Sequence, residues 1–154
     1  MVCWSMLKHK FQKWLELTVE ERTLLFIAFF LLPFVKIIRL GGFSRLQKIM
    51  GSMGLHSDKK KACKTETLDK ARRAARMVSI AAAYCPIAAS CLDRSLLLRI
   101  LLQRQGIDSS LFFGVRKDQG NFEAHAWVEI DGTVLNDTPD VRERYAPFPE
   151  PISD

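Results

Sequence analysis

The chain has 154 residues, of which 48% are hydrophobic and 26% charged, and this composition excludes an intrinsically disordered protein. A chain of this length can form one domain with its own hydrophobic core. The net charge of +6 is unevenly divided, because residues 1–80 carry 16 basic and 6 acidic side chains, whereas residues 81–154 carry 7 and 11. We therefore expect the two halves to do different jobs.

A capping-box pattern at Thr18 and Glu21 predicts the start of a helix over Val19–Arg39. The strongest apolar stretch, Leu24–Ile38, lies within it, but it is interrupted by a proline and a lysine and is shorter than the roughly 18 residues that a membrane-spanning helix needs. We favour a helix buried in the core. Contact with a membrane surface or a partner protein is the alternative, and a membrane span is the weakest interpretation.

Helical spacing of apolar residues predicts a second helix over Thr67–Ala83, after a possible short helix over Ser44–Met53. The basic side chains of Arg72, Arg73 and Arg76 lie opposite its apolar face. No aromatic residues are interleaved with these charges, so the pattern does not favour nucleic-acid binding. We expect no nucleic-acid partner.

The pattern changes from helices to strands in the second half of the chain. A third helix is predicted from Cys91 to Gln105, because Gly106 follows it as a terminator. Alternation and β-branched residues then predict three strands, whereas the proline-rich tail from Pro139 is expected to be irregular. Helices followed by an antiparallel sheet indicate an α+β fold. The predicted strands are Ser109–Arg116, Phe122–Ile130 and Thr133–Asn136.

The four cysteines indicate a reducing compartment rather than disulfides or zinc. No pair has the spacing of zinc ligands, and residues 1–13 lack the pattern of a secretory signal. We therefore expect a cytoplasmic protein with free thiols, no metal and no other cofactor. The cysteines are Cys3, Cys63, Cys85 and Cys91.

Three residues of the second half have the chemistry of a nucleophilic site: Cys91, His125 and Asp137. A thiol at a helix N-terminus has a lowered pKa, because the helix dipole and free N–H groups stabilise the thiolate. A histidine can then act as base and acid, and a carboxylate can orient its ring. Each residue also has a purely structural interpretation: a buried thiol, a core histidine, a turn-capping carboxylate.

The hairpin at Asp131-Gly132 determines whether Asp137 can reach His125. A two-residue loop would place Asp137 opposite Ala126 and on the wrong side of the sheet. A three-residue loop beginning at Ile130, with a left-handed glycine, would place it opposite His125. We predict the three-residue loop.

The residues around these positions resemble a known family, the leader peptidases of lasso-peptide biosynthesis. These are the B-type maturation proteins of the transglutaminase-like, papain-related superfamily, and the resemblance covers about residues 86–137. It lies in the segments Cys91–Leu98, Arg104–Ile107, Phe113–Lys117, Phe122–Glu129 and Val134–Asp137.

The resemblance implies a cysteine peptidase that removes the leader from a ribosomally made precursor peptide. It implies Cys91 as nucleophile, His125 as base and acid, and Asp137 as the orienting residue, with helices packed on the antiparallel sheet. The first 80 residues show no alternating strands, which favours the stand-alone form of the family. That form works with a separate leader-binding winged-helix protein, and an ATP-dependent cyclase then closes the ring.

This interpretation divides the chain into residues 1–84, a helical region for docking and core support, and residues 85–154, the catalytic core. The basic helical region is then a surface for acidic partners: the leader-binding protein, the leader or the cyclase. Two alternatives stay open. The same triad could transfer an acyl group to an amine, or the fold could be a non-catalytic interaction module.

Overall fold

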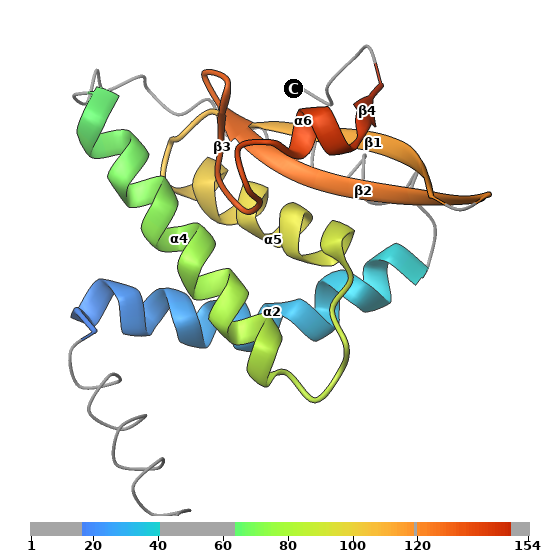
Figure 1. Ribbon diagram of the computed structural model, residues 1–154. Coiled ribbons are helices and arrows are strands. Elements are labelled where there is room, and N and C mark those ends of the chain that lie inside the picture. Colours follow the sequence, from blue (N-terminus) through green and yellow to red (C-terminus); the bar gives the residue numbers. More distant parts are fainter. Residues whose placement is uncertain (1–16, 41–63, 119, 149–154) are drawn as a thin grey trace, which may run out of the picture.

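The computed structural model describes residues 17–40, 64–118 and 120–148, and it has the predicted α+β order of helices followed by an antiparallel sheet (Figure 1). The three long helices agree with the predicted ranges to within one residue at each end, except that the second begins three residues earlier than predicted. The possible helix over Ser44–Met53 lies outside the described residues. The elements are α2 (Val19–Leu40), α4 (Lys64–Tyr84), α5 (Cys91–Arg104), β1 (Ser110–Asp118), β2 (Asn121–Ile130), β3 (Thr133–Val134), α6 (Val141–Arg144) and β4 (Ala146–Pro147).

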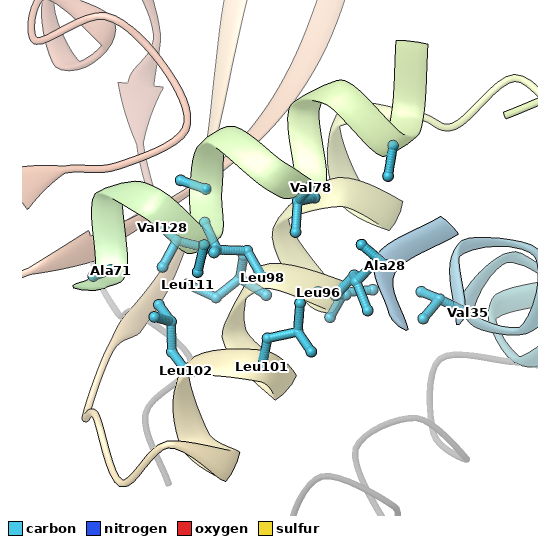
Figure 2. Packing of buried hydrophobic residues seen from close by; sticks show 14 of the residues in the cluster. Ala28, Val35, Ala71, Val78, Leu96, Leu98, Leu101, Leu102, Leu111 and Val128 are labelled. Carbon is cyan, nitrogen blue, oxygen red and sulfur yellow. The ribbon is translucent and has the colours of Figure 1, made fainter. Parts of the chain in front are cut away.

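Helix α5 is the centre of the main core. Figure 1 shows it between the sheet on one side and α2 and α4 on the other. Its sequence is apolar on most sides, and that is why it can be covered by both layers at once. Figure 2 shows side chains from α2, α4, β1 and β2 around it: Ala28, Val35, Ala71, Val78, Leu111 and Val128 lie close to Leu96, Leu98, Leu101 and Leu102.

Helix α2 is buried on one face only. Ala28, Leu32 and Val35 belong to the main core, as expected for a core helix. Aromatic and aliphatic side chains on the other face are more than half exposed, so the expectation of a buried helix is correct for one side of it. Among the helices that the structure describes, none combines the length and apolar character needed to span a bilayer.

The sheet has the order β3-β2-β1-β4, and all neighbouring strands are antiparallel. Its second face carries a smaller cluster, in which Trp127 packs against Val141 and Tyr145. These contacts order the tail that we expected to be irregular, and that prediction was wrong for α6 and β4. Pro147 has no backbone N–H to donate, and it is tolerated because it stands in a two-residue strand at the edge of the sheet, where no further strand requires a donor.

The hairpin between β2 and β3 has a two-residue loop, so the predicted three-residue loop was wrong. Ile130 pairs with Thr133, and both loop residues have positive φ, 47° at Asp131 and 78° at Gly132. These angles are those of a type I′ turn, whose twist matches that of the flanking strands. Asp-Gly suits this turn as well as it suits a bulged loop, which is why the sequence did not separate the two.

Candidate active site

Cys91 is the first residue of α5, as predicted, and its position is set by a capping box. The Ser90 hydroxyl accepts from the Asp93 N–H at 3.2 Å, and Asp93 Oδ2 accepts from the Ser90 N–H at 2.9 Å. This exchange ends the loop and starts the helix at the cysteine. The thiol is free and partly buried, at the positive end of the helix dipole.

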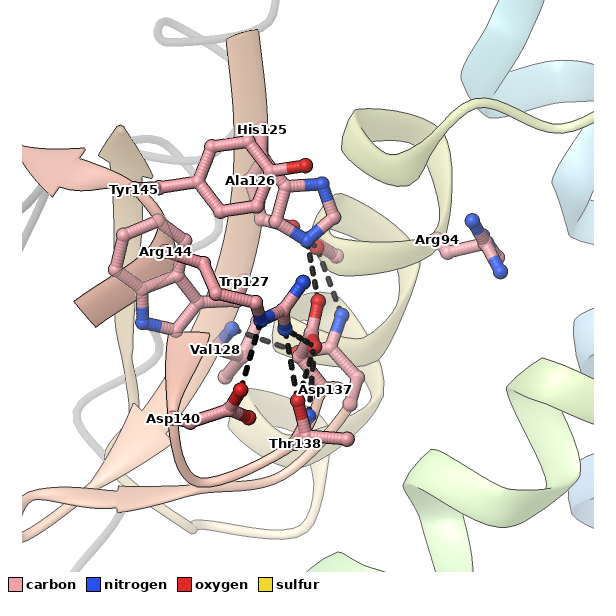
Figure 3. Close-up of polar contacts among 12 residues, drawn as sticks. Arg94, His125, Ala126, Trp127, Val128, Asp137, Thr138, Asp140, Arg144 and Tyr145 are labelled. Atoms are coloured by element: carbon pink, nitrogen blue, oxygen red, sulfur yellow. Dashed lines mark hydrogen bonds and ion pairs between the residues drawn. The ribbon is translucent and has the colours of Figure 1, made fainter. Parts of the chain in front are cut away.

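His125 and Asp137 form a direct hydrogen-bonded pair between Nε2 and Oδ2 (Figure 3). The other carboxylate oxygen, Oδ1, accepts from the Thr138 backbone N–H at 2.6 Å and from the Arg144 guanidinium. Burial raises the pKa of Asp137, but hydrogen bonds from Thr138, His125 and Arg144 outweigh burial and hold that pKa below its ordinary value. Asp137 is therefore an acceptor, so Nε2 of His125 carries the proton and Nδ1 is the basic nitrogen.

Asp137 reaches His125 in spite of the two-residue loop because the β3 ladder ends early. The last backbone bond runs from the Leu135 N–H to Val128 O, at 3.0 Å. The Asn136 side chain then accepts from the Val128 N–H at 2.8 Å, in the place of a backbone carbonyl. Residues 135–137 form a bend instead of continuing the strand. Strand alternation no longer applies to Asp137, so the rule on which we based the loop prediction did not hold at this position.

Asn136 also connects the sheet to α5. Its amide donates to the Ser95 hydroxyl at 2.8 Å, and that hydroxyl donates to Ala126 O at 2.9 Å. Ser95 lies one turn after Cys91, and Ala126 follows His125 directly. This buried network therefore fixes the helix that carries the thiol against the strand that carries the imidazole. A serine directly before the apolar residues Leu96–Leu98 of α5 was the available signal, and sequence reasoning missed it.

The tail supplies two further residues that sequence reasoning missed, Arg144 and Tyr145. Tyr145 stacks on the His125 ring, and Arg144 lies beside Asp137 and 3.1 Å from an Asp140 oxygen (Figure 3). Helix α6 is anchored by Arg142, whose guanidinium donates to both oxygens of Glu129 at 2.8 and 2.6 Å. No local sequence pattern predicts the roles of Arg144 and Tyr145, because these roles depend on how the tail folds back over β2.

Cys91, His125 and Asp137 line one cavity of about 420 Å³ between α4, α5 and the end of β3. The structure therefore brings all three predicted site residues together. A thiol at a helix start, a histidine and an orienting carboxylate in one cavity can carry out acyl chemistry.

A family model described as the transglutaminase-like superfamily matches residues 37–150. The chain belongs to the transglutaminase-like superfamily. This membership confirms the fold that the resemblance implied. The superfamily match begins within α2 and extends beyond β4, so it covers the whole site.

Among curated proteins, this transglutaminase-like chain is similar to the microcin J25-processing protein McjB of Escherichia coli. The two are 38% identical over 60 residues, which is 39% of this chain and 28% of McjB. The matched segment thus spans little more than a quarter of that relative. No solved structure matches the chain.

Proposed function

We propose that this chain is a cysteine peptidase that cuts the leader from a lasso-peptide precursor. The main support is that one cavity is lined by Cys91, the first residue of α5, and by the hydrogen-bonded pair of His125 and Asp137. Superfamily membership, the similarity to a microcin-processing protein and the motif resemblance support the same assignment.

In the proposed mechanism, the Cys91 thiolate attacks the carbonyl carbon of the last leader residue. Protonated His125 then gives its Nδ1 proton to the departing amine of the core peptide, and a thioester remains on Cys91. Water attacks the thioester while His125 takes up its proton, which releases the leader carboxylate and restores the thiolate. Asp137 keeps the ring orientation throughout. The Cys91 backbone N–H is one donor available to the oxyanion.

The proposed partners follow from the family resemblance. They are the precursor peptide, a separate leader-binding winged-helix protein and an ATP-dependent cyclase, all in the cytoplasm. We also propose the division of labour at residue 84, with docking contacts on the helical region before it and catalysis on residues 85–154. The basic excess of residues 1–80 supports a role in contacts with acidic surfaces.

Mass spectrometry of the lasso precursor incubated with the chain and the leader-binding protein tests the proposal. We expect two products, the free leader and the core peptide, and no cleavage by Cys91→Ala. Cys85→Ala is the matched control, since Cys85 is also a free, partly buried thiol but does not line the cavity. Normal trimming by Cys91→Ala would refute the proposal. A leader joined to an added amine, with no hydrolysed leader, would instead identify an acyl transferase.

A further inference from the structure

Three arginines line the same cavity as the cysteine. Arg72 and Arg76 stand one turn apart on α4, and Arg94 stands one turn after Cys91 on α5. The sequence suggested one continuous basic face that also included Arg73. The structure separates them, because Arg73 lines a different cavity together with Glu21 and Gln105.

In the described part of the chain these three arginines form no close ion pair, although Arg76 acts at longer range on Glu21 and helps to lower the pKa of that carboxyl. Arg94 makes one long contact, from Nε to Ser90 O at 3.4 Å. The only carboxylate on the cavity wall, Asp137, is already paired with His125 and Arg144.

The rest of the wall combines apolar side chains with uncharged polar ones. The apolar ones include Ala75, Val78 and Leu135, and the polar ones are Ser79, Asn136 and Thr138. The cavity therefore holds three guanidinium groups without a close ion pair and offers uncharged polar groups beside them. Guanidinium groups bind carboxylates through paired N–H donors, and the bond is stronger where water is partly excluded.

We propose that this cavity binds a carboxylate of the peptide substrate close to the scissile bond, through Arg72 and Arg76 with Arg94 adding to the positive field. This specificity rests on the proposed peptidase function. The carboxylate can belong to an acidic side chain or to a chain end, and the experiment distinguishes these sources.

Alkylation of Cys91 tests the charge of the cavity without a peptide. Iodoacetate carries a carboxylate and iodoacetamide does not, so the ratio of their rate constants reports attraction of an anion to the thiol. We expect each arginine removed to lower this ratio about 2- to 3-fold, and Arg72→Gln with Arg76→Gln to lower it about 5-fold. Because the Debye length is only about 3 Å at 1 M salt, high salt should also reduce the ratio of the two rate constants in the wild type.

Arg73→Gln is the matched control, since it removes the same charge from the same helix outside the cavity. Peptide mapping assigns the modified thiol to Cys91, and Cys91→Ser gives the background from other cysteines. Circular dichroism checks that each variant is folded. Equal ratios in wild type and in the Arg72→Gln, Arg76→Gln double variant would overturn the proposal.

Cleavage of matched peptides then tests specificity. A set with a single Glu or Gln at each position around the cut should show one position at which Glu raises kcat/KM in wild type and not in the double variant. A preference that depends on a free rather than an amidated C-terminus would assign the carboxylate to a chain end. Cleavage with no charge preference and an unchanged alkylation ratio would refute the carboxylate site and leave the peptidase proposal standing. An alkylation ratio that depends on the arginines, with no peptide cleaved, would support the carboxylate site and refute the peptidase proposal.

Discussion

Tyr145 stacks on the imidazole of His125, with 4.7 Å between the ring centroids and 25° between the planes. The tyrosine is almost fully buried, and its hydroxyl donates to a Glu123 oxygen at 3.1 Å. Trp127 lies near the same imidazole, with 6.2 Å between centroids. The imidazole is therefore fixed by aromatic rings as well as by Asp137, and the site depends on a tail that looked structureless in the sequence.

Replacing Tyr145 separates ring packing from hydrogen bonding. Tyr145→Ala should lower kcat/KM for the proposed cleavage about 10-fold or more, because a misplaced imidazole meets the thiolate in poor geometry. It should also destabilise the fold by about 3 kcal/mol, as expected for a buried aromatic side chain. Tyr145→Phe keeps the ring and loses only the contact to Glu123, so its activity should stay near wild type. Equal losses in the two variants would show that the stacked ring is not the important part.

Arg144 should set the lower pH limit of activity through Asp137. Its guanidinium is one of the groups that hold the pKa of Asp137 down, so in Arg144→Ala that pKa rises. The carboxylate is then protonated at a higher pH, and the acid limb of the kcat/KM profile should shift to higher pH. A kcat/KM about 10-fold lower near pH 7 is expected as well, with partial recovery in Arg144→Lys. An unchanged acid limb would mean that Asp137 is not held by Arg144 in solution.

The elements that the sequence predicted well are those with a strong local pattern. Helix α5 was found because apolar residues run through it and Gly106 follows it, and the start at Cys91 was found because Ser90 can cap it. The choice of Cys91, His125 and Asp137 came from residue chemistry and motif resemblance, and the structure places all three in one cavity.

The features that were missed depend on tertiary contacts. Helix α6 has only four residues and is held by Val141 against Trp127 and by Arg142 on Glu129, none of which is visible locally. The loop between β2 and β3 was misjudged because an Asn136 side chain ends the ladder, which no rule of strand alternation includes. Local sequence predicts elements, but it does not predict which side chain replaces a backbone partner.

Asn136 should matter for both stability and activity. Asn136→Ala removes the acceptor for the Val128 N–H and the donor to Ser95, so we expect a loss of about 1–3 kcal/mol in unfolding free energy. The fall in kcat/KM should exceed what the loss of folded protein accounts for, because the same hydrogen bonds align α5 with β2. Ser95→Ala loses the two bonds made by its hydroxyl and keeps the ladder end, so its effect should be smaller. Urea unfolding and kcat/KM measured on the same preparations check this order.

The pair Glu129–Arg142 makes stability depend on acid pH. Burial raises the pKa of Glu129, but hydrogen bonds from Arg142 and Trp127 outweigh it and hold the pKa below the ordinary value of 4.5. At pH values between the folded-state pKa of Glu129 and 4.5, this carboxyl group binds more protons in the unfolded chain than in the folded one. The contribution is therefore complete above about pH 4.5 and is lost as pH falls through the lower, folded-state pKa. The pKa of Asp137 is also lowered in the folded state, so part of the loss of stability at acid pH will persist without Glu129.

Arg142→Gln should thus destabilise the fold at pH 7 by about 1–3 kcal/mol, because it leaves the Glu129 carboxylate buried with only the indole N–H of Trp127 as a donor. It should also flatten the loss of stability below pH 4.5, since the pKa of Glu129 then rises. Lys70→Gln is the matched control, because the Glu66–Lys70 pair is exposed and should contribute little. Urea unfolding at pH 7 and at pH 3–5, followed by tryptophan fluorescence, measures both effects. If the two variants behave alike at pH 7, the ion pair between half-exposed Arg142 and buried Glu129 does not anchor α6.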